Sequence, residues 1–151
     1  MLDDTSRSIL RQLQADPSMS VPDLADRLRL TPGRVARRID KMREEGYILG
    51  REAVIDWRAL GYDVNVSLRI TLDKTNPRAF DAFTEAAREI PEVIEIQTFL
   101  GRVDVRLSVI ARTLPEYQAL YRDRILALPH IDDIESLMTV ATVQARRALP
   151  I

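Results

Sequence analysis

Apolar residues recur at helical spacing in three short stretches within the first fifty positions. The first stretch covers residues 3–16, where Ile9, Leu10 and Leu13 form an apolar stripe. Pro17 follows and cannot continue a helix. The pattern predicts a short amphipathic helix that ends before Pro17.

The second and third stretches carry clear helix start signals. Ser20-Val21-Pro22-Asp23 is typical of a capping box with Ser20 as the N-cap. Thr31 is a suitable N-cap for the third stretch, since proline follows it and favours the first helical position, and Gly46 can close that helix. Three such helices, the last two joined by a tight turn, predict a helix-turn-helix that covers about residues 21–40. The apolar faces consist of Val21, Leu24, Ala25 and Leu28 in the second helix, and of Val35, Ile39 and Met42 in the third.

The segment after Gly46 changes from helical spacing to a strand-like pattern. Residues 47–55 predict two short strands with a turn near Gly50, as in the wing of a winged helix-turn-helix. We therefore expect a DNA-binding domain over residues 1–56. Residues 57–61 are the expected linker to a second domain, which we place at residues 62–151.

The second half alternates between strand and helix patterns. Residues 64–72 alternate strictly between apolar and polar, which is typical of a half-buried strand. The resulting order, βαββαβ, predicts an α+β domain of the ferredoxin-like kind. The other expected elements are a helix over 77–90 with Phe80, Phe83, Ala87 and Ile90 at helical spacing, a hairpin of 93–100 and 103–111 around Gly101, a helix over 115–128 in which Tyr117 and Tyr121 pack on the sheet, and a last strand over 134–143.

Composition narrows the class of protein. Hydrophobic residues make up 46% and charged residues 30%, a balance that is normal for a soluble globular chain. We expect no membrane-spanning helix, because the chain has no apolar run of 18 residues, and the acidic first residues do not resemble a signal peptide. Cysteine is absent and His130 is the lone histidine, so we expect no disulfide, metal or cofactor. A cytoplasmic location follows as the expectation.

Positive charge is concentrated in one segment. Residues 27–43 hold seven basic side chains and one acidic side chain, although the whole chain has a net charge of −1. Within the third helix, the basic residues lie opposite the apolar stripe. A solvated basic face is one explanation, because exposed arginine is common on helices. Its position on the third helix of a helix-turn-helix favours DNA binding instead.

The expected DNA contacts divide into base contacts and phosphate contacts. Base contacts come from the N-terminal part of a recognition helix, and arginine can pair with guanine through two hydrogen bonds. We therefore assign Gly33, Arg34 and Arg37 to bases. Arg38, Lys41 and Arg51 are assigned to phosphates. Ser20 at the start of the second helix is a further candidate, since free amides there can hold a phosphate, and Thr31 joins the set as N-cap of the third helix.

At this point the chain resembles the Lrp/AsnC family, the feast/famine regulators of bacteria and archaea. The resemblance covers essentially the whole length. It rests on Leu2-Asp3-Asp4, Ile9-Leu10-Arg11-Gln12-Leu13-Gln14-Ala15-Asp16, Leu24-Ala25, Leu30-Thr31-Pro32, Arg38-Ile39, Glu45-Gly46-Tyr47-Ile48-Leu49-Gly50, Gly101, Asp104 and Leu128-Pro129.

The resemblance implies a DNA-binding transcription regulator with a winged helix-turn-helix and an effector domain. It also implies homodimers formed through the C-terminal sheets, association into octamers, and binding to palindromic DNA. The effector would be an amino acid or related metabolite, bound near the loop between the second and third strands of the effector domain. The mixed polar face of residues 65, 67, 69 and 71 also suggests an interface.

The effector loop departs from the family pattern. The family usually has Gly-Asp, an aromatic residue and Asp, whereas this chain has Gly101-Arg102-Val103-Asp104. Glycine would allow a ligand to approach the backbone, and Asp104 can pair with an ammonium group. Alternatively, Gly101 only closes a hairpin and Asp104 only caps it. The expected effector residues are Leu100, Gly101, Arg102, Val103 and Asp104, with Ser136 contributed by a neighbouring subunit.

Two other functions fit the same scaffold. Some siroheme decarboxylases resemble this family, but they are expected to carry histidines or other basic groups in a tetrapyrrole pocket. Here the chain has a single histidine and an intact basic recognition helix, which argue against that function. A stand-alone effector-binding module that regulates another protein is the second alternative. The helix-turn-helix favours a regulator without enzymatic activity.

Overall fold

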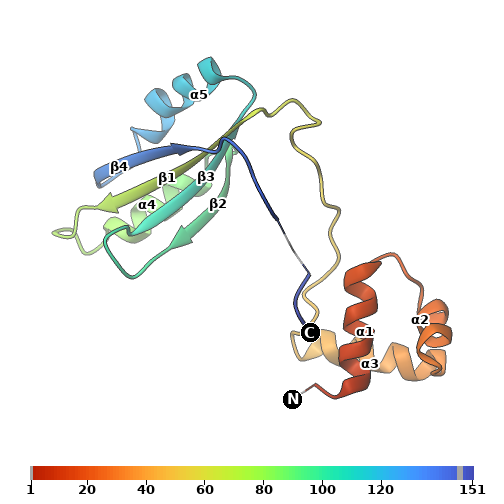
Figure 1. Cartoon of the computed structure of the whole chain (residues 1–151). Helices are drawn as coiled ribbons and strands as arrows, with labels where there is room; N and C mark the ends of the chain where they lie inside the picture. The colour runs from red at the N-terminus through yellow and green to blue at the C-terminus, as the bar shows by residue number, and fades with distance from the viewer. Residues whose placement is uncertain (1, 146–147) are drawn as a thin grey trace. The chain divides into compact units, whose positions relative to one another are not determined.

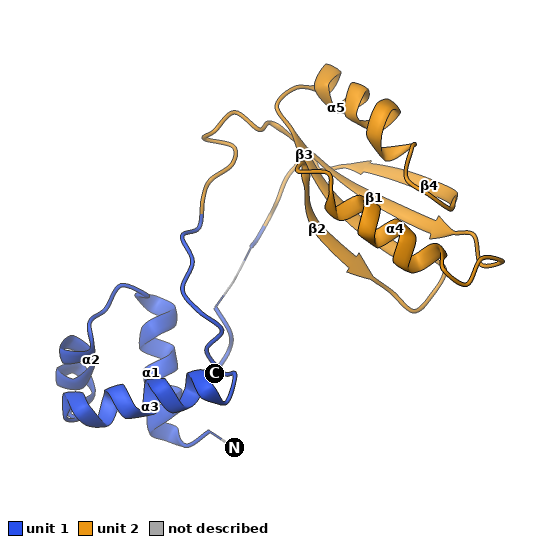
Figure 2. Cartoon of the chain, turned by 180° about the vertical axis from the view of Figure 1, so that it is seen from behind, with its two compact units in different colours: residues 1–54, 144–151 blue, residues 55–143 orange. Residues whose placement is uncertain are grey.

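A computed structural model describes residues 2–145 and 148–151 of the chain. These residues form two compact units, coloured separately in Figure 2. The first unit comprises residues 1–54 together with 144–151, and the second comprises residues 55–143. Residues 144–151, which the sequence pattern placed in the second domain, thus group with the helical unit. No helix among the described residues has both the length and the apolar character needed to cross a membrane.

The first unit contains the three predicted helices: α1 (Asp4–Ala15), α2 (Val21–Leu28) and α3 (Pro32–Glu44) (Figure 1). Local chemistry sets their ends. The Asp3 carboxylate accepts a hydrogen bond from the Ser6 backbone amide at 2.8 Å and caps α1. Pro32 occupies the first turn of α3. The apolar stripes meet in one core, whose buried residues are Ile9, Met19, Leu24, Ala25, Val35, Ile39 and Met42.

Two backbone conformations shape the turns of this unit. Arg29 ends α2 with a φ of 54°, a left-handed conformation that is uncommon for a residue with a Cβ atom. Gly46 follows α3 with a φ of 77°, as its position predicted. The backbone amides of Tyr47 and Ile48 then both donate to the Met42 carbonyl. This arrangement ends the helix and holds the chain against its last turn.

The prediction of two wing strands over residues 47–55 is wrong for the single chain. Residues 48–56 have no regular secondary structure. Leu49, Val54 and Ile55 are exposed, although their spacing suggested strands. A strand needs a partner strand for its backbone hydrogen bonds. Here the amides of Tyr47 and Ile48 donate to the Met42 carbonyl instead.

The second unit confirms the βαββαβ order. Its strands form one antiparallel sheet in the order β2-β3-β1-β4. Helices α4 and α5 pack on the face that carries Val66, Leu68 and Ile70 of β1, all of them buried (Figure 1). The elements are β1 (Val64–Leu72), α4 (Ala79–Arg88), β2 (Val93–Thr98), β3 (Val105–Ala111), α5 (Leu114–Leu120), the π-helix η1 (Tyr121–Ile125) and β4 (Ile131–Met138).

Two details of the helices in this unit differ from the sequence pattern. Phe80 is 43% exposed, because α4 turns Ala79, Phe83 and Ala87 toward the sheet instead. The helix that begins as α5 continues as the π-helix η1 from Tyr121. Tyr117 packs on the sheet as predicted and is buried.

The last strand is shifted toward the N-terminus relative to the predicted range of 134–143. It begins at Ile131, which pairs with Leu72 of β1. The final bond to β1 joins the Thr139 amide to the Asn65 carbonyl, next to the first residue of β1. The strand ends there because β1 offers no further partner, and Val140 and Val143 are exposed.

Candidate DNA interface and effector loop

The N-terminal half of α3 presents free arginine side chains to solvent. Val35 and Ile39 face the core, which leaves Gly33, Arg34 and Arg37 exposed on the opposite side. Among the described residues, the Arg34 guanidinium has no hydrogen bond or ion pair. The Arg37 Nε donates only to the Gly33 carbonyl, at 3.3 Å. Both side chains can therefore form new hydrogen bonds without breaking an ion pair.

The C-terminal half of α3 carries basic residues in exposed pairs. Lys41 lies 3.6 Å from Glu45, and Arg43 lies 3.2 Å from Asp40. Exposed pairs of this kind stabilise a helix only slightly. Exchange of Glu45 for a DNA phosphate at Lys41 would therefore cost little.

Arg38 differs from its neighbours because its guanidinium contacts α1. Its Nη1 lies 2.7 Å and 2.6 Å from the two carboxylate oxygens of Asp3, and 3.0 Å from the Ser6 hydroxyl. The pKa of Asp3 is held well below its usual value. The hydrogen bond from Arg38 has the largest effect, and the hydrogen bonds from Ser6 lower the pKa further. The sequence pattern predicts a phosphate contact for Arg38 and does not indicate its pairing with Asp3, because 35 positions separate the two residues.

The other expected DNA contacts lie on the surface of the first unit. Thr31 is the N-cap of α3, and its exposed hydroxyl makes no hydrogen bond to any residue that the structure describes. Arg51 is exposed in the segment that lacks the predicted wing strands. Ser20 caps α2 as predicted, and its hydroxyl donates to the Asp23 carboxylate. Because Asp23 carries a negative charge, it competes with a phosphate at this helix end.

Asp104 joins the β2–β3 loop to the end of β1. Its Oδ2 accepts a hydrogen bond from the Leu72 amide at 2.9 Å, and its Oδ1 lies 3.5 Å from the Lys74 ammonium. Its own amide donates to the Ile70 carbonyl. The carboxylate therefore already has a structural partner and a cationic partner in the single chain.

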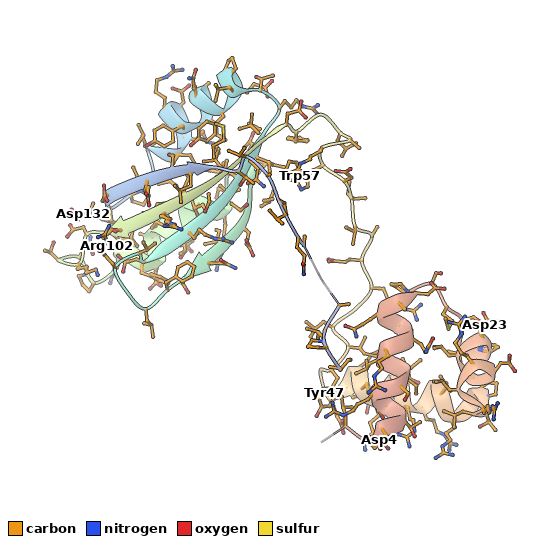
Figure 3. All side chains as sticks on the ribbon, viewed as in Figure 1. Asp4, Asp23, Tyr47, Trp57, Arg102 and Asp132 are labelled. Atoms are coloured by element: carbon orange, nitrogen blue, oxygen red, sulfur yellow. The ribbon has the colours of Figure 1, made fainter. Side chains whose placement is uncertain are left out.

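The loop itself is open to solvent. Leu100, Gly101 and Arg102 are exposed, and Val103 is half-buried. Gly101 does not have a positive φ, and a Cβ atom there would have no neighbour within 4 Å. The turn therefore does not itself require glycine. The Arg102 carbonyl accepts from the Thr71 hydroxyl, and its side chain projects from the loop end of the sheet (Figure 3).

Ser136 lies apart from this loop within one chain. Ser136 belongs to β4 and pairs with Leu68 of β1. Strand β3, which follows the loop, pairs with the other edge of β1. The Tyr117 hydroxyl lies 3.4 Å from the Ser136 hydroxyl, and burial raises the pKa of Tyr117. The contribution of Ser136 to a site at the loop of a neighbouring chain stays a prediction.

The sheet face away from α4 and α5 carries a mixed polar surface. Ser67 of β1 pairs with Ser108 of β3 in the middle of the sheet. Two ion pairs flank them: Arg106 with Glu95 at 2.8 Å, and Arg69 with Glu135 at 3.7 Å. The Arg106 Nε is buried and has no hydrogen-bond partner in the part of the chain that the structure describes. Neither helix of this unit covers the face.

Each of the two units matches the profile of a known protein family. Residues 2–48 match the family profile described as winged helix-turn-helix DNA-binding, and residues 65–149 match the Lrp/AsnC ligand binding domain. The proline dehydrogenase transcriptional activator of Rhodobacter capsulatus is 33% identical over 143 residues, which are 95% of this chain and 93% of that protein.

Solved structures show the same fold over nearly the whole chain. An AsnC family transcriptional regulator from Agrobacterium tumefaciens has a TM-score of 0.88 at 32% identity, covering 99% of this chain and 97% of that one. A transcriptional regulator from Neisseria meningitidis in complex with L-methionine has a TM-score of 0.91 at 21% identity, with the same coverage of both chains. With a DNA-binding helix-turn-helix and a ligand-binding α+β domain in the family's order, this chain belongs to the Lrp/AsnC family of transcription regulators.

Proposed function

We propose that the protein recognises a palindromic operator through α3 and adjusts this recognition when an amino acid, or a related metabolite, binds the second unit. The observation that carries the proposal is the pair of exposed arginines, Arg34 and Arg37, at the start of a recognition helix. DNA contact makes the cytoplasm the expected location. The named relatives are transcription regulators, which supports a role without catalysis.

The contacts divide by their position along α3. Arg34 and Arg37 reach base edges in the major groove, and Gly33 lets the helix end approach the duplex. Lys41 and Arg51 contact phosphates, for which their exposure suits them. Thr31 adds an exposed hydroxyl at the start of the helix. Ser20 contributes through the backbone amides of α2, in competition with Asp23.

The sheet face centred on Ser67 and Ser108 forms the homodimer interface. Two-fold pairing of identical faces doubles the DNA contact and matches a palindromic site. Further association of dimers into an octamer would bring the effector loop of one chain near Ser136 of a neighbour. This assembly agrees with the separation of the two elements within one chain.

The effector site includes the loop from Leu100 to Asp104. Its glycine leaves the backbone accessible, although the turn does not require one. Because the Lys74 ammonium already lies beside Asp104, a ligand ammonium would take its place. Among the described residues, the Arg102 guanidinium has no hydrogen bond or ion pair, which suits a carboxylate on the ligand. The Neisseria relative, solved with L-methionine, supports an amino acid as the ligand class.

Selection of bound DNA from a random pool tests the proposed function. We expect enrichment of a two-fold symmetric motif, whose half-sites lie about one helical turn apart or a multiple of it. Repeating the selection with a panel of amino acids should change the yield or the spacing for at least one of them. Recovery of unenriched sequences from every pool would contradict sequence-specific recognition.

Asp104 has a predicted structural effect that can be separated from its effect on ligand binding. Asp104→Ala leaves the Leu72 amide without its acceptor, which should lower the free energy of unfolding by about 1–3 kcal/mol in urea titrations. Asp104→Asn keeps an oxygen acceptor and should lose less stability. If Asp104 also binds a ligand ammonium, calorimetric titration with amino acids should show weaker binding for the Asn variant. Equal binding by Asp104→Asn and wild type would assign the carboxylate to structure alone.

A further inference from the structure

The ion pair between Asp3 and Arg38 joins the N-cap of α1 to the middle of the recognition helix. Arg38 is the least exposed partner among the ion pairs of α3, with 24% of its side chain accessible. One guanidinium nitrogen contacts both Asp3 carboxylate oxygens and the Ser6 hydroxyl. Asp3 is itself held in place, because its Oδ1 accepts the Ser6 amide as the cap of α1.

This geometry does not suit a phosphate contact by Arg38. A phosphate would have to replace a carboxylate bound at 2.6–2.7 Å, or approach next to its negative charge. Arg34 and Lys41, by contrast, are exposed on the same helix. To bind DNA, Lys41 would break only its exposed ion pair with Glu45, and Arg34 would break no ion pair with a described residue. The α3 surface therefore divides into residues available to DNA and one arginine committed to α1.

We infer that the Asp3–Arg38 pair sets the orientation of α3 on α1, and that Arg38 positions the base-reading arginines without touching DNA itself. Apolar contacts between these helices, such as those of Ile9, Val35 and Ile39, are non-directional and permit small rotations. A charge-assisted hydrogen bond is directional and fixes a rotation. Arg34 and Arg37 need this accuracy, because a bidentate contact with guanine tolerates little displacement.

The inference rests on the proposed reading of the major groove by α3, and it makes a prediction opposite to that of simple electrostatics. Asp3 is an acidic residue on a DNA-binding unit. If it acted only through its charge, its removal would strengthen DNA binding by reducing repulsion of phosphates. If it holds Arg38 in place, its removal should weaken recognition of the specific site.

Asp3→Asn and Asp4→Asn are a matched pair of variants. Each removes one negative charge at adjacent positions, and asparagine is as good an N-cap as aspartate, so α1 keeps its cap. Asp4 is exposed and makes no side-chain hydrogen bond or ion pair among the described residues. We expect Asp3→Asn to lower affinity for the selected operator by ~10-fold, comparable to partial loss of one base contact, with little change on a scrambled duplex. Asp4→Asn should bind both duplexes as the wild type does, or slightly more tightly.

Arg38→Gln provides a second measurement that leaves the Asp3 cap intact. Loss of a phosphate contact lowers the slope of log affinity against log salt by about one, as we expect for Lys41→Gln. Arg38→Gln should instead keep the wild-type slope while it loses specific affinity. Circular dichroism of each variant checks that the helices are formed, and if Asp3→Asn does not fold, Arg38→Gln alone decides.

Either of two results would overturn the inference: equal operator affinities for Asp3→Asn and Asp4→Asn, or a slope lowered by about one in Arg38→Gln. A wild-type protein that binds operator and scrambled duplexes equally would refute the proposed function rather than this inference.

Discussion

Replacing Arg34 with alanine should weaken operator binding by about 1–3 kcal/mol while leaving the affinity for a scrambled duplex nearly unchanged. The guanidinium is exposed in the first turn of α3 and has no partner to give up among the described residues. It can therefore form both hydrogen bonds to a guanine edge on binding. Competition binding on the two duplexes measures the ratio directly, and Arg37→Ala should behave in the same way.

Lys41→Ala is the control for Arg34→Ala. Lys41 lies two turns further along α3, where it forms an exposed ion pair with Glu45. Its loss should weaken binding to both duplexes about equally and lower the salt slope by about one. If Arg34→Ala also weakened both duplexes equally, Arg34 would be a phosphate contact and not a base-reading residue.

Ser67→Glu should prevent formation of the proposed homodimer, so that the protein is a monomer, and should abolish tight operator binding. Ser67 lies in the middle of the sheet, opposite Ser108, on the face that α4 and α5 do not cover. In a two-fold dimer both chains carry the substitution, so two negative charges lie in one interface. Like charges brought together in this way cost several kcal/mol. Because a palindromic site is bound by two linked units, loss of the dimer removes one half-site contact from each complex.

Light scattering at micromolar concentration measures the dimer directly. Gln118→Glu is the matched control, because it adds the same charge at an exposed position of α5 and should leave the mass unchanged. A fragment of residues 62–151 should also be dimeric. A Ser67→Glu protein that keeps the wild-type mass would show that the dimer uses another surface.

Much of this architecture was predictable from short stretches of sequence, because neighbouring residues determine it. Ser20, Pro32 and Gly46 act on backbone groups within a few positions of themselves, and the helices they bound appear where predicted. The alternation in residues 64–72 likewise predicted β1 over its full length, since side chains of a strand alternate between its faces. The exposed arginines of α3 follow from the same logic, because the apolar stripe fixes which side of the helix faces solvent.

The tertiary structure alone decided the features that depend on partners far along the chain. The end of β4 is set by where β1 begins, and Phe80 is exposed because Ala79 and Phe83 fit the sheet better. The apolar runs on either side of Gly50 suggested two strands over residues 47–55, but residues 48–56 form no strand in this structure. Asp3 binds Arg38, which lies 35 positions away in the sequence. Asp104 accepts a hydrogen bond from the backbone amide of Leu72, which lies 32 positions away. A carboxylate in a sequence shows its charge, but which amide or guanidinium satisfies it depends on how distant elements pack, and that packing is a property of the whole fold.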